Sequence, residues 1–171
     1  MDKFYRLLIG ITFTFLLFSI LVRAVHGSEV RFKEYTIQGN LEEKDVIAVT
    51  MLDEYSTLNI SSLGGDQVKT NRILEQVHDK KLNTVCLNVC ASAAAVIYQA
   101  GHRHDGQPEG ATLIFHAPGI DLPDGSRQLA PNVSYWKKVY GFLGIDKLLT
   151  KSQWDIMWER PEVVIEIDIK G

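Results

Sequence analysis

The sequence lacks an excess of positive charge. It has 18 lysine and arginine residues against 21 aspartate and glutamate residues, and its formal net charge is −3. Proteins that bind nucleic acid through its phosphates need a basic patch or stripe, and none is present, so nucleic acid is not expected as a partner. Internal repeats and low-complexity tracts are also missing. With 171 residues and ordinary apolar and charged fractions, the chain is predicted to form one globular domain.

An apolar run long enough to span a bilayer is absent as well. The run at residues 7–22 has 16 residues, whereas a spanning helix needs about 20. Lys3 and Arg6 precede this run, and small residues at 24–28 follow it. A basic start, an apolar middle and a small-residue end are typical of a secretory signal peptide.

Cleavage of this signal defines the mature chain. A cut after Gly27 places small residues around the scissile bond, and a cut after Ala24 is nearly as good. We therefore expect a signal peptide at residues 1–27 and a mature domain at residues 28–171, located in the periplasm or secreted. The alternative is that this segment stays uncleaved as an anchor. The protein is expected to be attached to a membrane only in that case. Cleavage removes three basic residues and one acidic residue and moves the net charge from −3 to −5.

Cysteine is scarce, with only Cys86 and Cys90 present. In an exported protein such a pair is ordinarily joined in a disulfide. Residues 82–89, however, have the apolar pattern of a strand, in which positions four apart are separated by about 13 Å, against a limit of about 7 Å for a bridge. We therefore expect two buried thiols, and a bridge only if the strand ends before Asn88.

Strand and helix patterns alternate along the mature chain. Asn40 and Glu43 have the spacing of a capping box at the start of the first helix. The expected strands are residues 31–38, 57–60, 82–89, 111–115 and 162–169. The expected helices are residues 40–54, 68–77, 91–100, 132–149 with a break near 141–144, and 152–158, while residues 119–131 should form an exposed loop. This alternation predicts an α/β domain with crossover connections and a largely parallel sheet.

A serine and a histidine follow two of the expected strands. Ser92 lies where an apolar strand gives way to a helix of small residues, and His116 ends the strand at residues 111–115. Gly64 and Gly65 end a third strand, and without Cβ atoms they can aim backbone N–H groups at a bound carbonyl. Because parallel strands end at the same edge of a sheet, we expect these residues to meet. Acyl transfer needs such a nucleophile, base and set of N–H donors.

Three motifs at these positions resemble a known family. They are Ser-Leu-Gly-Gly at 62–65, Cys-Ala-Ser-Ala at 90–93 and Leu-Ile-Phe-His-Ala-Pro at 113–118. In order and separation they are similar to those of the proteolytic subunit of the Clp protease and its relatives in the ClpP/crotonase superfamily. The resemblance covers residues 35–118, with a weaker match near the C-terminus. It implies a single domain built as a ClpP/crotonase-like spiral of ββα units, a peptide or protein substrate, no cofactor and a homo-oligomer.

The resemblance also implies roles for individual residues. Ser92 would be the nucleophile of a serine peptidase and His116 its base. The backbone N–H groups of Gly65 and Ala93 would form the oxyanion hole, with Gly64 beside them. Asp155 precedes the Pro-Glu step at 161–162 at the family's spacing, which makes it the expected acid of the triad in preference to Asp146 or Asp168.

The sequence departs from the family in ways that limit what is carried over. Leu63 replaces the usual proline of the glycine loop, and Asp66 places a carboxylate beside the expected oxyanion hole. The segment between His116 and Asp155 is shorter than in the Clp subunit, so a double ring and an ATPase partner are not expected. The expected function is that of an ATP-independent serine peptidase. The alternatives are a catalytically inactive binding or scaffold protein and a crotonase-like acyl-thioester enzyme, against which the export signal argues.

A metal site is not expected. His102 and His104, together with Asp105, could chelate a cation. A convincing third and fourth ligand with suitable spacing is missing from the sequence, and structural zinc requires four. We therefore interpret residues 102–105 as a solvated loop.

Overall fold

The computed structural model describes residues 31–104 and 108–169, so the expected signal peptide at residues 1–27 and Asp105 lie outside the described residues. The strands are β1 (Phe32–Asn40), β2 (Leu52–Gly64), β3 (Asn83–Ala91), β4 (Thr112–Phe115), β5 (Gly119–Asp121), β6 (Arg127–Leu129) and β7 (Ile165–Asp168). The helices are α2 (Glu43–Thr50), α3 (Gln67–Asp79), α4 (Ala93–Gln99), α5 (Val133–Phe142), α6 (Ile145–Leu148) and α7 (Lys151–Glu159). In this described part of the chain, no helix combines the length and apolarity needed to cross a bilayer.

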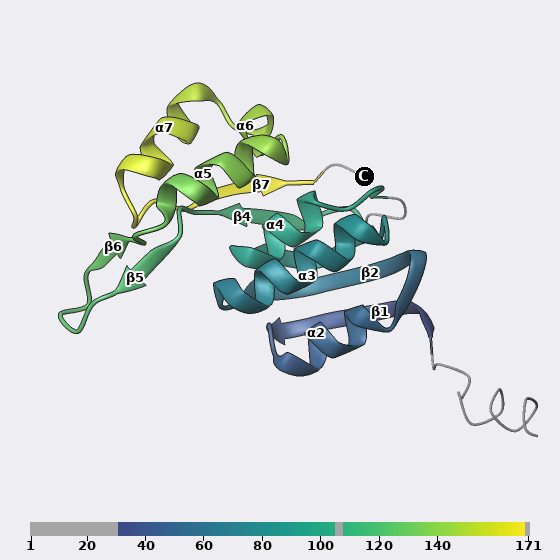
Figure 1. Ribbon diagram of the computed structural model, residues 1–171. Helices are drawn as coiled ribbons and strands as arrows, with labels where there is room; N and C mark the ends of the chain where they lie inside the picture. Colours follow the sequence, from purple (N-terminus) through teal and green to yellow (C-terminus); the bar gives the residue numbers. More distant parts are fainter. Residues whose placement is uncertain (1–30, 105–107, 170–171) are drawn as a thin grey trace, which may run out of the picture. The chain divides into compact units, whose positions relative to one another are not determined.

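Five strands form one sheet in the order β1-β2-β3-β4-β7 (Figure 1). Strands β1 to β4 are mutually parallel, and β7 pairs antiparallel with β4. Helices α2, α3 and α4 connect the parallel strands and lie side by side along the sheet, while α5, α6 and α7 follow near β7. The prediction of an α/β fold with a largely parallel sheet is confirmed.

The core lies between the parallel strands and the helices that connect them. Ile37, Leu58 and Ile60 from β1 and β2 are fully buried, as is Ile73 of α3. Burial of side chains of this size contributes about 1.5–3 kcal/mol each. Helix α4 approaches the sheet closely because its buried residues begin with alanines at 94 and 95. The strands that end at the site are therefore anchored in the hydrophobic core.

The first helix begins later and ends earlier than expected. Asn40 belongs to β1 and pairs with Gly64 of β2, so it is not available as a helix cap. Glu42 takes that position, and its backbone N–H donates to Asp45 Oδ2 over 2.8 Å. Helix α2 ends at Thr50, because the following residues enter the parallel ladder with β1 as the first part of β2.

The prediction of two free thiols is wrong, because Cys86 and Cys90 form a disulfide with their Cα atoms 6.0 Å apart. Strand β3 does not end early, as the bridge seemed to require, but bulges. Its pairing with β2 moves from Ile60↔Cys86 to Ser62↔Cys90, so two steps along β2 correspond to four along β3. The extra residues, which include the 43% exposed Leu87, take up chain length and bring the two cysteines together.

Candidate functional site

Ser92 occupies a strained turn between β3 and α4. Its φ is 55° and its ψ is −124°, a conformation that residues with a Cβ rarely adopt and that costs about 1–3 kcal/mol. The turn is held from two sides: the Ser92 N–H donates to the Ile114 carbonyl over 2.8 Å, and the Ser92 carbonyl accepts from Val96 N–H at 3.2 Å. A serine on a sharp strand-to-helix turn of this kind exposes its hydroxyl for nucleophilic attack.

Gly64 lies directly against this turn. Its φ is +98°, and a Cβ built on it would lie 2.9 Å from the Ala91 carbonyl oxygen and 3.0 Å from both the Ala93 nitrogen and the Ser92 Cβ. Only glycine therefore permits the approach of β2 to Ser92. The Gly64 N–H donates to Ser62 Oγ over 3.0 Å. Gly64 thus provides space beside Ser92, and its amide already donates to Ser62.

The amides of Gly65 and Ala93 differ from that of Gly64. Ala93 is the first residue of α4, and the N–H groups in the first turn of a helix have no acceptor within the helix. Gly65 packs against Leu41, whose Cβ would lie 2.7 Å from a Cβ at that glycine. Among the described residues, neither the Gly65 nor the Ala93 amide has a hydrogen-bond acceptor. Both residues line the same pocket as Ser92, so two N–H donors are available there.

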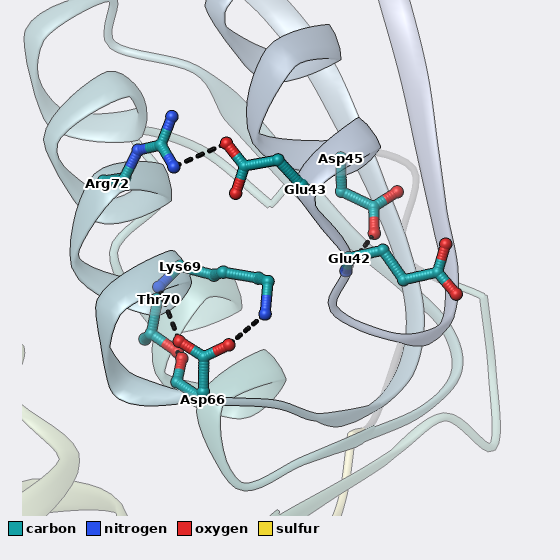
Figure 2. A network of polar contacts seen from close by, with 7 residues as sticks. All are labelled: Glu42, Glu43, Asp45, Asp66, Lys69, Thr70 and Arg72. Carbon is teal, nitrogen blue, oxygen red and sulfur yellow. Dashed lines mark hydrogen bonds and ion pairs between the residues drawn. The ribbon is translucent and has the colours of Figure 1, made fainter.

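A network of polar contacts fixes the loop that carries these glycines (Figure 2). Asp66 caps α3 by accepting from the Lys69 N–H over 3.0 Å, and the Lys69 ammonium group forms an ion pair with its carboxylate. Thr70 Oγ1 donates to the Asp66 carbonyl over 2.7 Å, and Arg72 joins α3 to Glu43 of α2 over 2.6 Å. Lys69 lowers the pKa of Asp66, so the carboxylate stays charged and directed at a cation.

His116 follows β4 and lines the same pocket as Ser92, Gly65 and Ala93. The pocket has a volume of about 280 Å³. Strands β3 and β4 are parallel and pair at Ala91↔Ile114, so the residues that follow them emerge at the same edge of the sheet. The structure thus brings together four of the residues that the sequence singled out.

The hydrogen bond of His116 defines its tautomer. Nδ1 lies 2.9 Å from the carbonyl oxygen of Ala117, and because a carbonyl can only accept, Nδ1 carries the hydrogen. The lone pair is therefore on Nε2. Burial is the main cause that lowers the pKa of His116, and the charge of Arg127 lowers it further. At neutral pH the imidazole is uncharged and can accept a proton.

Asp155 does not lie with these residues. It forms an ion pair with Lys151 on α7 and lines a separate surface hollow with Lys151, Ser152, Ile156 and Glu159. Helix α7 packs through Met157 and Trp158, and the solvated hollow holds the Asp155 carboxylate. The structure therefore does not bring the expected triad acid to His116.

The two other acids considered from the sequence are also apart from the imidazole. Asp168 accepts from Thr112 Oγ1 over 3.1 Å at the start of β4, whereas His116 follows its end. Asp146 is exposed on α6. Asp121 of β5 is the carboxylate whose charge acts on His116, where it raises the pKa slightly against the larger effect of burial.

The other residues that line the pocket include Arg127, Trp136 and Tyr140, none of which the sequence analysis named as a site residue. Trp136 and Tyr140 lie four residues apart on α5, and Tyr140 donates its hydroxyl to the His116 carbonyl over 3.1 Å. This spacing places both rings on one helix face, which is the signal that could have found them. Arg127 begins β6, in the segment expected to be a loop, and no motif surrounds it.

The histidines considered as metal ligands have other contacts. His104 stacks on Tyr98 with ring centroids 4.4 Å apart, and its Nδ1 lies 3.0 Å from Thr84 Oγ1. The His102 ring contacts the Tyr55 ring edge-on, with the two ring centroids 5.8 Å apart. Within residues 31–104 and 108–169, no group of three or more histidine, cysteine or acidic side chains is arranged to hold a metal ion.

Comparison with protein-family models gives no match for this chain, and comparison with curated proteins gives none either.

Proposed function

We propose that this protein is an ATP-independent serine hydrolase that cleaves peptide bonds or related acyl bonds. One observation carries the proposal: Ser92 on its strained turn, the neutral His116 and the unpaired amides of Gly65 and Ala93 line one pocket. A nucleophile, a base and oxyanion donors are the parts that acyl transfer requires. The parallel strands with their connecting helices support the finer assignment to a ClpP/crotonase-like spiral.

In the proposed mechanism, His116 Nε2 takes the proton of the Ser92 hydroxyl while Oγ attacks the carbonyl carbon. The oxyanion accepts hydrogen bonds from the Gly65 and Ala93 amides. The imidazolium then gives its proton to the leaving amine, and water, activated by the same imidazole, releases the acyl group from Ser92. The Ala117 carbonyl holds Nδ1–H where a triad would use a carboxylate. Asp155 takes no part in these steps.

The proposed location and assembly have separate support. Export to the periplasm or beyond rests on the signal pattern of residues 1–27, and the Cys86–Cys90 disulfide supports it because such bonds persist in oxidising compartments. Self-association as a homo-oligomer rests on the family resemblance.

A fluorophosphonate probe tests the proposal, since it reacts covalently with an activated serine. We expect the folded protein to be labelled, with the adduct on Ser92 when its peptides are mapped by mass spectrometry. Protein unfolded in denaturant is the control and should not react, because the turn and the base are then lost. No adduct on the folded protein, or an adduct on another serine, would contradict the proposal.

The pH dependence of labelling tests the role of His116. A base must be neutral to act, and the pKa of His116 lies below its usual 6.5. The labelling rate should therefore fall as the pH is lowered and His116 becomes protonated, with the midpoint of the fall below pH 6.5. Rates measured from about pH 4.5 to pH 8 give the midpoint. A midpoint above 6.5 would rule out His116 in this environment as the base.

A second candidate function is peptide binding without catalysis. It is favoured by the absence, among the described residues, of a carboxylate hydrogen-bonded to His116, and by the ion pair that holds Asp155 elsewhere. Equal peptide binding by the parent protein and Ser92→Ala, with turnover by neither, would identify this function instead.

A further inference from the structure

Arg127 is a cation in the pocket whose ion pair with Asp121 lacks a hydrogen bond. Its side chain is only 31% exposed, and its buried Nε has no hydrogen-bond acceptor within the described part of the chain. The Asp121 carboxylate lies 3.8 Å from Nε, beyond hydrogen-bond distance, and its own side chain is 84% exposed to water. The ion pair therefore leaves hydrogen-bonding capacity of the guanidinium unused.

A second nitrogen of the same guanidinium faces another donor. Arg127 Nη2 lies 3.4 Å from His116 Nδ1, which already carries the hydrogen that it donates to Ala117. Nδ1 cannot accept from Arg127 in this tautomer, so two N–H groups face each other. An oxygen anion in the pocket would give Nε of the guanidinium the acceptor that residues 31–104 and 108–169 do not supply.

Trp136 adds a third unpaired donor. It is 3% exposed and lines the same pocket, and its buried Nε1 has no acceptor among the described residues. A buried N–H group that has lost water and found no acceptor is destabilising. A pocket with several such donors is suited to a ligand that brings acceptors.

Arg127 lies in a hairpin in which β6 pairs antiparallel with β5, and the first residue of β5, Gly119, leaves room for its side chain. A Cβ at Gly119 would lie 2.4 Å from Arg127 Nε, so the guanidinium lies over a residue without a side chain. The acid that lines the pocket, Asp66, is paired with Lys69. With His116 neutral, the charge presented to a ligand by the pocket is that of Arg127.

We propose that Arg127, assisted by Trp136, binds a carboxylate of the substrate next to the scissile bond. This inference rests on the proposed function and gives it a substrate class: peptides with an acidic residue near the cleaved bond or with a free C-terminal carboxylate. A planar guanidinium can bind both oxygens of a carboxylate, which neither tryptophan nor neutral histidine can do.

Binding to the Ser92→Ala variant tests this proposal without requiring turnover. The probes are fluorescein-labelled peptides that differ only in Glu against Gln, or in a C-terminal acid against the amide, and the readout is anisotropy. We expect about 10- to 100-fold tighter binding of the side-chain acid, the terminal acid or both. Which pair shows the difference identifies the source of the carboxylate. Equal affinities within both pairs would overturn the proposal.

Variants at Arg127 assign the preference to this residue. In the Ser92→Ala background, Arg127→Gln should reduce the preference to less than about threefold, and Arg127→Lys should keep part of it because the charge remains. The matched control is Arg160→Gln, which removes an exposed arginine paired with Glu162 outside the pocket and should keep the full preference. A preference that survives in a folded Arg127→Gln variant would overturn the assignment. If the parent also hydrolyses no peptide while the binding preference is present, the proposed function fails and the carboxylate site stands.

Discussion

Replacement of Ser92 by alanine is expected to lower the rate of peptide-bond hydrolysis on the order of 10⁶-fold, as removal of the nucleophile does in a serine peptidase. The substitution removes the hydroxyl group alone. The Ser92 side chain makes no capping hydrogen bond to α4, so its loss removes no helix cap. The variant should therefore fold as the parent does. Turnover of a peptide substrate measures the loss of hydrolysis, and near-UV circular dichroism checks that the fold is retained. Residual hydrolysis near the parent rate would show that another residue is the nucleophile.

Glycine at the same position separates catalysis from strain. Ser92→Gly also lacks the hydroxyl and should be as inactive as Ser92→Ala. Its stability should differ, because glycine adopts a φ of 55° without the clash that a Cβ causes. We expect Ser92→Gly to be about 1 kcal/mol more stable than Ser92→Ala in denaturant unfolding. Equal stabilities would mean that the turn stores little strain.

Gly64→Ala is expected to produce the largest loss of stability, on the order of 3–5 kcal/mol. The new Cβ would meet backbone atoms at 2.9 and 3.0 Å, which cannot rotate away as a flexible side chain can, and the φ of +98° adds strain. Whatever folded protein remains should react poorly with the fluorophosphonate, because the displaced atoms include those of Ser92. Denaturant unfolding and the labelling rate per folded molecule are the measurements.

Gly39→Ala is the matched control for this substitution. Gly39 has a φ of +78°, but a Cβ there would meet nothing within 4 Å. This variant carries the conformational strain alone and should lose only about 1 kcal/mol, with labelling unchanged. If the two variants lost the same stability, the close approach of Gly64 to Ser92 would not be what makes glycine necessary.

The part of the site that the sequence predicted follows from strand direction. Ser92, His116 and Gly65 were each placed at the end of a strand, and a largely parallel sheet brings such ends to one edge. This inference needs no loop geometry, only the identity and sense of each strand. Asp155 was assigned differently, by a spacing carried over a connecting segment that is shorter here than in the resembled family. A separation along the chain does not determine where a residue lies in the fold. In the structure Asp155 forms an ion pair with Lys151.

The errors in the fold have a common cause, since local patterns were read without their tertiary partners. The 13 Å separation expected for Cys86 and Cys90 holds for a regular strand, and the bulge against β2 changes it. Asn40 is a good capping residue by type, but the ladder with Gly64 engages it. Strands β5 and β6 have three residues each, too few for an alternating pattern to appear within a Gly- and Asp-rich segment. Arg127 was missed for this reason.

The last strand has a consequence for biosynthesis. β7 covers the edge of β4, and its pair Phe115↔Ile165 adjoins His116 although fifty residues separate the partners along the chain. Until translation has passed Ile165, β4 has β3 as its single neighbouring strand, and the strand that His116 follows is an open edge of the sheet. A nascent polypeptide that has not yet reached β7 therefore carries Ser92 and His116 on an incomplete sheet, and we expect competence for the proposed reaction only after β7 has paired with β4.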